Sequence, residues 1–241
     1  MIEEVLQNSD MTDRELVLVL SSPGGEGLAA ERIVNICRTY SRGSFSVIVP
    51  KMAKSAATMI CFGAKRILMS DTSELGPVDP QVPIRDDSGK IIDYQAAHEV
   101  VEAYKELMMK ANTTRGKVEP FLQQLARFDA RDIRRIASAQ KLSESIAIKS
   151  LKSGCLGKMS EAAIRAKIKP FLEPRHTISH GRPIYPEFAK QCGLTIDVID
   201  ATSQLWKSIW SLYVRINHLV STTTAAKVIE SQATHFVASV S

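Results

Sequence analysis

The sequence has no pair of cysteines at the spacing that a zinc site or a redox-active motif requires. Its four cysteines stand far apart among apolar neighbours, at Cys37, Cys61, Cys155 and Cys192. This spacing argues against a zinc site and against a disulfide framework. We therefore expect free, buried thiols in a reducing compartment, and no metal ion.

Long apolar runs and a basic leader are also missing. No stretch reaches about 18 consecutive apolar residues, so no membrane span is expected. Residues 1–5 carry no basic region followed by an apolar run, which is unlike a signal peptide. We expect a soluble protein in the cytoplasm.

Signatures of nucleic-acid binding are absent too, although the formal net charge is +5 and the pI about 9.0. Residues 126–141 mix lysine and arginine with Asp129 and Asp132, as a solvated helix face does. No zinc knuckle, helix-turn-helix or RNA-recognition signature is found. We expect no nucleic-acid partner.

Hydrophobic periodicity predicts an α/β unit in the first seventy of the 241 residues. Short apolar runs at 15–20, 45–49 and 66–69 are typical of buried strands. Helical patterns at 28–40 and 55–64 separate them. Strands that alternate with helices predict a mostly parallel sheet, with ligand sites at the carboxyl ends of its strands.

The remainder of the chain is predicted to be mainly helical. We expect a loop at 73–83, with a polar turn at 86–89, and one further strand at 194–199. Residues 1–220 are expected to form a single domain, and residues 221–241 a loose tail. Trp206, Trp210 and Tyr213 share one face of the last helix, 202–220, which favours packing or an oligomer contact. The predicted helices are 94–110, 118–128, 130–150, 160–167, 186–193 and 202–220.

Two turns carry the residue types that serine hydrolysis needs. Residues 22–25 (Ser-Pro-Gly-Gly) follow a buried strand, and their glycines expose backbone N–H groups. Ser55 opens a buried helix, whose N-terminal dipole favours developing negative charge. A nucleophilic hydroxyl beside backbone donors is the arrangement that acyl transfer requires.

These segments resemble the serine dehydrogenase proteinase family of the ClpP/crotonase superfamily, which is related to the signal-peptide peptidase SppA. The likeness rests on residues 22–25, on 50–58 (Pro-Lys-Met-Ala-Lys-Ser-Ala-Ala-Thr) and on 74–81 (Glu-Leu-Gly-Pro-Val-Asp-Pro-Gln). Residues 180–184 (His-Gly-Arg-Pro-Ile) are similar to a later motif of the family. The resemblance extends over about 15–220.

The resemblance implies a ClpP-like fold of stacked ββα units and a peptidase that acts on peptide or protein substrates. It implies that Ser55 is the nucleophile, and that Gly24, Gly25 and the N–H of Ala56 form the oxyanion hole. It further implies a homo-oligomer, trimeric or hexameric. Such hydrolysis needs no cofactor.

The sequence departs from its relatives at the general base. ClpP carries its histidine after the strand that follows the nucleophile helix, and residues 76–79 contain none. Enzymes like SppA use a lysine, for which Lys90 or His98 lies at a suitable distance along the chain. Lys54 is adjacent to Ser55, and Asp79 either lines the pocket or caps a loop. His180 is a weaker alternative.

Three other interpretations stay open. Ser55 on its own is typical of a helix N-cap. Crotonase relatives use the same oxyanion hole for coenzyme A thioesters. A chain without a base, and with only fourteen residues before its first strand, is also consistent with a catalytically degenerate scaffold that assembles with partners.

Overall fold

Four short strands form one parallel sheet at the centre of the molecule. This computed structural model describes residues 1–9, 15–86, 88–173 and 182–239. The strand order is β1-β2-β4-β8, and every neighbouring pair is parallel. The predicted α/β class with a parallel sheet is therefore confirmed. The strands are β1 (Val17–Val19), β2 (Ser46–Val49), β4 (Arg66–Met69) and β8 (Ile196–Val198).

A second, shorter parallel ladder lies beyond the carboxyl ends of this sheet. It pairs β3 (Met52–Ala53) with β5 (Glu74–Leu75). Single bridges extend the ladder on both sides, from Ser22 to Ala53 and from Ile184 to Leu75. Because β3 continues directly from the turn after β2, the ladder carries the chain from the main sheet to Ser55.

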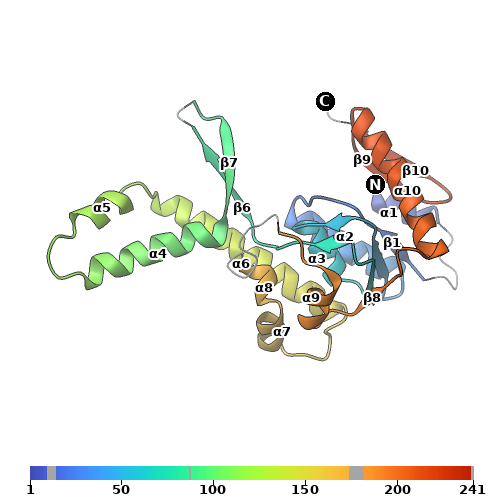
Figure 1. Cartoon of the computed structure of the whole chain (residues 1–241), viewed down its shortest axis with the longest axis horizontal. Helices are drawn as coiled ribbons and strands as arrows, with labels where there is room; N and C mark the ends of the chain where they lie inside the picture. Colours follow the sequence, from blue (N-terminus) through green and yellow to red (C-terminus); the bar gives the residue numbers. More distant parts are fainter. Residues whose placement is uncertain (10–14, 87, 174–181, 240–241) are drawn as a thin grey trace.

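Helices α2 (Gly27–Tyr40), α3 (Ala56–Phe62) and α6 (Ala130–Ser153) pack against one another beside the main sheet (Figure 1). Every residue of α3 is buried, which explains why so short an apolar segment forms a stable helix. Phe62 meets Phe171 edge to face, with ring centroids 5.2 Å apart. This packing fixes α3, and with it the residue that precedes the helix.

An arm projects from this body (Figure 1). It comprises α4 (Ala97–Thr113), α5 (Glu119–Leu125) and the first half of α6, with a hairpin of β6 (Gln81–Arg85) and β7 (Ile91–Ala96). Residues 73–83 were predicted to be a loop, but β5 and the start of β6 lie there. The Asp86 N–H donates to the Lys90 carbonyl where the hairpin closes. Pro83 is tolerated because the sheet has only two strands.

The C-terminal region is helical, as predicted, up to the end of α10 (Gln204–Thr222). The following residues form an antiparallel hairpin of β9 (Ala225–Glu230) and β10 (His235–Ser239) rather than a loose tail. The four consecutive Ser and Thr residues at 221–224 suggested a loose tail, so the strands that follow them were not predicted. The remaining helices are α1 (Ile2–Gln7), α7 (Glu161–Lys167), α8 (Lys169–Leu172) and α9 (Pro186–Gln191).

Candidate active site

The two turns that the sequence singles out lie side by side. The Ser22 N–H donates to the Met52 carbonyl at 3.0 Å, and the Lys54 N–H donates to the Ser22 carbonyl at 3.1 Å. These two hydrogen bonds form the bridge between Ser22 and β3. They place the Gly24-Gly25 turn directly beside Ser55.

Ser55 has a backbone conformation that few residues other than glycine adopt, with φ 50° and ψ −118°. It precedes α3 at the N-cap position, yet its side chain makes no capping hydrogen bond. A strained serine on a sharp strand-to-helix turn is the geometry that exposes a nucleophilic hydroxyl in several hydrolases. The conformation therefore favours a nucleophile over an N-cap.

Gly24 packs against the turn that carries Ser55 at a distance that no side chain would permit. A Cβ added to Gly24 would lie 2.9 Å from both the Ser55 Cβ and the Lys54 carbonyl oxygen. Its φ of +117° likewise suits glycine. The residue is thus needed for the close approach of the two turns.

The amide groups around Ser55 differ in their availability. The Gly24 N–H donates to the Ser22 Oγ at 3.1 Å, so it is already engaged. The N–H groups of Gly25 and Ala56 donate no hydrogen bond to any residue that the structure describes. Of the three predicted oxyanion-hole residues, Gly25 and Ala56 therefore hold the free donors.

Lys54 points away from Ser55. Its Nζ lies 3.1 Å from Glu74 Oε1 and donates to the Leu75 carbonyl at 3.3 Å. Glu74 belongs to the family-like segment 74–81. The sequence alone does not predict its ion pair with Lys54, because no sequence pattern indicates that residues 54 and 74 are in contact.

The two predicted bases occupy different surroundings. Lys90 is exposed and lies beside the turn that closes the β6–β7 hairpin, where the Asp86 N–H donates to the Lys90 carbonyl. His98 is buried in the first turn of α4. Within the described part of the chain, no hydrogen bond joins either side chain to Ser55. His180 lies outside the described residues.

His98 is held by a residue that the sequence gave no reason to select. The amide Nε2 of Gln140, on α6, lies 3.2 Å from His98 Nδ1. With Nδ1 accepting, the neutral imidazole carries its proton on Nε2, which has no partner among the described residues. A base acting through Nε2 requires the other tautomer, with the Gln140 carbonyl oxygen accepting from Nδ1.

Asp79 is an interior residue, only 2% exposed, at the start of the α4 arm. Neither carboxylate oxygen has a hydrogen-bond partner of ordinary geometry within the described residues. Burial raises the pKa of Asp79 to about 7, with a further upward contribution from Glu99, although the amides of His98 and Ala97 lower it. A carboxyl group that changes charge near neutral pH is thus placed in the loop that follows β5.

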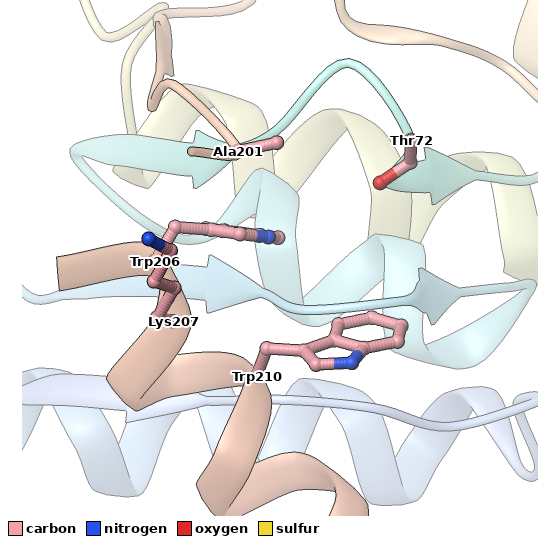
Figure 2. A pocket seen from close by; sticks show the side chains of 5 residues that line it. All are labelled: Thr72, Ala201, Trp206, Lys207 and Trp210. Atoms are coloured by element: carbon pink, nitrogen blue, oxygen red, sulfur yellow. The ribbon is translucent and has the colours of Figure 1, made fainter. Parts of the chain in front are cut away.

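Two cavities lie elsewhere on the molecule. One, of about 210 Å³, lies at the carboxyl ends of β4 and β8 and is lined by Thr72, Ala201, Trp206, Lys207 and Trp210. Figure 2 shows Trp206 between Ala201 and Trp210 in this view. The other, of about 450 Å³, is lined by Glu15, Ser41, Ser44, Lys65 and Arg66. Neither includes Ser55 or Asp79.

Metal ligands do not gather near these residues. In the ranges that the structure describes, no group of three or more His, Cys, Asp and Glu side chains is arranged to hold a metal ion. In the same ranges, no helix combines the length and apolar character needed to traverse a bilayer.

A comparison with known protein families matches a segment that contains both turns. Residues 2–94 match the family described as ClpP-like SDH-type serine proteinases. The predicted family resemblance is confirmed. This proteinase-like segment contains Ser55, both glycines of the turn, Lys90 and Asp79, and it ends before His98.

Two curated relatives come from Methanocaldococcus jannaschii. The chain is 37% identical to the "Uncharacterized protein MJ0137" over 82 residues, and 34% identical to the "Uncharacterized protein MJ1495" over 82 residues. Each match covers 33% of this chain and 28% of the relative, so the chain matches little more than a quarter of either protein.

A solved structure is also similar. It is a mutant of the 1510-N membrane-bound stomatin-specific protease in complex with a substrate peptide. The identity is 14% and the TM-score 0.32, with 87% of this chain and 88% of that chain covered.

Replacing Ser55 by glycine is expected to stabilise the protein by about 1 kcal/mol, because glycine adopts the observed φ without strain. Ser55→Ala keeps the Cβ and should change stability by less than about 0.5 kcal/mol, since no capping hydrogen bond is lost. Urea unfolding measures both. If the Ala variant instead loses about 1 kcal/mol, Ser55 is a helix cap.

The raised pKa of Asp79 predicts a pH-dependent stability. Between about pH 4 and pH 7 the folded protein holds a proton on Asp79 that the unfolded chain has released, so the free energy of unfolding falls as pH rises. Asp79→Asn removes this titration. We expect the variant to gain roughly 2–4 kcal/mol relative to wild type between pH 4.5 and pH 7.5.

Urea titrations at several pH values test this expectation. Asp71→Asn is the matched control, because Asp71 is exposed. Parallel stability curves for wild type and Asp79→Asn would show that the carboxyl group of Asp79 titrates in its ordinary range.

Proposed function

We propose that this protein is a serine peptidase with Ser55 as its nucleophile. The observation that carries the proposal is the strained backbone of Ser55 beside the Gly24-Gly25 turn, with the N–H groups of Gly25 and Ala56 unengaged. The match of residues 2–94 to a serine proteinase family supports the same chemistry.

In the proposed reaction, the Ser55 Oγ attacks the carbonyl carbon of a peptide bond. The developing oxyanion accepts hydrogen bonds from Gly25 and Ala56, and the positive end of the α3 dipole adds to this stabilisation. The general base takes the proton of the Ser55 hydroxyl and passes it to the amine as the C–N bond breaks. Water then hydrolyses the acyl-enzyme to the free acid and regenerates Ser55. Losing one such donor costs roughly 3–4 kcal/mol of barrier.

Of the two candidates for the general base, we propose His98. Its Nε2 is unpartnered, and Gln140 can fix the ring orientation through Nδ1. Lys90 lies in an exposed turn with no buried surroundings that would favour proton abstraction. Asp79, close to the start of the same helix, is a neighbouring titratable group, and its place in the substrate pocket stays a prediction.

The state of the cysteines supports a cytoplasmic location for this activity. All four are free thiols, and Cys37, Cys61 and Cys192 are buried. Burial raises the pKa of the Cys37 thiol to about 12, which makes it an inert core residue rather than a reactive one. Unpaired structural thiols of this kind are usual in a reducing compartment.

A fluorophosphonate probe tests the nucleophile. We expect it to label the wild-type protein on Ser55, and Ser55→Ala to abolish labelling while the fold persists. Ser44→Ala, at an exposed serine that shortly precedes β2, is the control and should label as wild type does. His98→Gln should slow labelling and remove the dependence of its rate on pH near neutrality.

Other outcomes would overturn the proposal. Labelling that persists in Ser55→Ala would exclude Ser55 as the nucleophile. A wild-type protein that resists the probe and co-purifies with partner proteins would be a scaffold. Thermal stabilisation by acyl-coenzyme A, absent with peptides, would indicate a crotonase-type enzyme.

We also propose that the chain self-associates through α10, as a trimer or hexamer. The buried face of this helix includes Trp206 and Ile209. Three leucines at seven-residue spacing form a second apolar stripe that stays exposed in the single chain, Leu205 (58%), Leu212 (43%) and Leu219 (41%). A heptad-spaced stripe of leucines is typical of a helix seam between subunits.

Substitution of Leu212 by lysine is expected to lower the oligomer mass, measured by sedimentation equilibrium, to that of smaller species. Leu142→Lys, on the exposed face of α6, is the control and should leave the mass unchanged. Circular dichroism checks that both variants fold. An unchanged mass for Leu212→Lys would place any subunit contact elsewhere.

A further inference from the structure

The side chain of Lys54 is anchored on the strand that runs beside the nucleophile turn. Its ion pair with Glu74 is largely shielded, since the side chains are 13% and 24% exposed. Its Nζ also donates to the backbone carbonyl of Leu75. Partly buried pairs of this kind are screened less by salt than surface pairs.

The aliphatic part of the Lys54 side chain is also closely packed. A Cβ added to Gly76 would lie 2.5 Å from the Lys54 Cδ and 3.3 Å from its Cα. Gly76 therefore leaves the space that the lysine stem fills. The lysine side chain lies along β5 and packs against the residue that follows this strand.

Thr58, in the first turn of α3, completes the connection. Its hydroxyl donates to the Ala53 carbonyl at 2.7 Å and accepts from the Gly76 N–H at 3.2 Å. The side chain is fully buried. The residues on both sides of Ser55 are thus tied to one short segment, 74–76.

A strained residue persists only where its surroundings leave it no alternative. On one side of Ser55, Gly24 packs so closely that a Cβ added to it would lie 2.9 Å from the Ser55 Cβ. On the other side, the segment 74–76 holds Lys54 and Thr58. Removing either contact gives the turn room to relax toward an ordinary backbone conformation.

We propose that the Lys54–Glu74 ion pair is a positioning element, which holds Ser55 in its strained conformation, and that Lys54 is not the general base. This inference rests on the proposed function of Ser55. It follows from where Nζ lies: its acceptors are Glu74 and Leu75, and no hydrogen bond joins it to Ser55 in the described chain.

Rates of fluorophosphonate labelling distinguish the two roles of Lys54. If the pair positions Ser55, Lys54→Met and Glu74→Gln should each slow labelling about 10- to 100-fold, since a misplacement of about 1 Å can cost that much. The double variant should be no slower than either single one. The residual rate should keep the pH dependence of wild type. Lys190→Met, which breaks the exposed pair with Glu187, is the control and should have no effect.

Two other results would contradict the proposal. If Lys54→Met abolishes labelling while Glu74→Gln labels as fast as wild type, Lys54 acts on the proton of Ser55 directly. If both variants label at the wild-type rate, the pair has no positioning role.

A second measurement does not depend on activity, so it separates this inference from the proposed function. Ser55→Gly should raise the melting temperature of the wild type by about 2–4 °C, because it relieves strain. In the Lys54→Met background the turn has already relaxed, so Ser55→Gly should raise the melting temperature only slightly. Equal shifts in the two backgrounds would show that the ion pair does not sustain the strain, even in a protein that the probe fails to label.

Discussion

The hydrogen-bonded bridge between Ser22 and Ala53 is the contact on which the candidate site depends. Ser22 follows a strand of the main sheet, and Ala53 ends a strand of the second ladder. Two backbone hydrogen bonds join them, which fixes the distance between the diglycine turn and Ser55 without any side chain. The proposed oxyanion donors and the proposed nucleophile are thereby positioned by the same ladder.

The strain at Ser55 is compensated by packing around it. All seven residues of α3 are buried, and Phe62 at its far end is locked against Phe171. A helix held this firmly shifts little, so the unfavourable φ angle can be relieved only by movement of the turn that precedes it. The cost of the strained residue is spread over a core that includes α2 and α6, which is how active sites commonly retain such conformations.

Local patterns in the sequence predicted the elements that build this core. The apolar runs around Leu18, Val47 and Ile67 and the helical patterns between them follow directly from residue order. Gly24-Gly25 marks its turn by composition. The family motifs added Ser55. The sequence does not show which side chains from distant parts of the chain contact each other. The Lys54–Glu74 pair, and the contact of Gln140 with His98, join residues 20 and 42 positions apart.

The strands β6 and β9 were not predicted, in each case because of residues within the strand or next to it in the sequence. In β6, Pro83 suggested a loop, yet a two-stranded ladder lets the missing N–H face outward. In β9, a run of Ser and Thr obscured the alternation that follows it. Both strands belong to small hairpins outside the main sheet, where hydrophobic patterning is weakest and turn chemistry decides the structure.

The arm has a hydrophobic cluster of its own. Ala97, Val101 and Ile136 are buried together there, separately from the core that holds α3. A cluster of three buried residues is far less stable than a domain core, so the arm is expected to open locally at a lower free energy than that core. His98 lies between Ala97 and Val101 on the same helix. Local opening of the arm would therefore break the contact between His98 and Gln140, and exchange of amide protons along α4 would follow the same event.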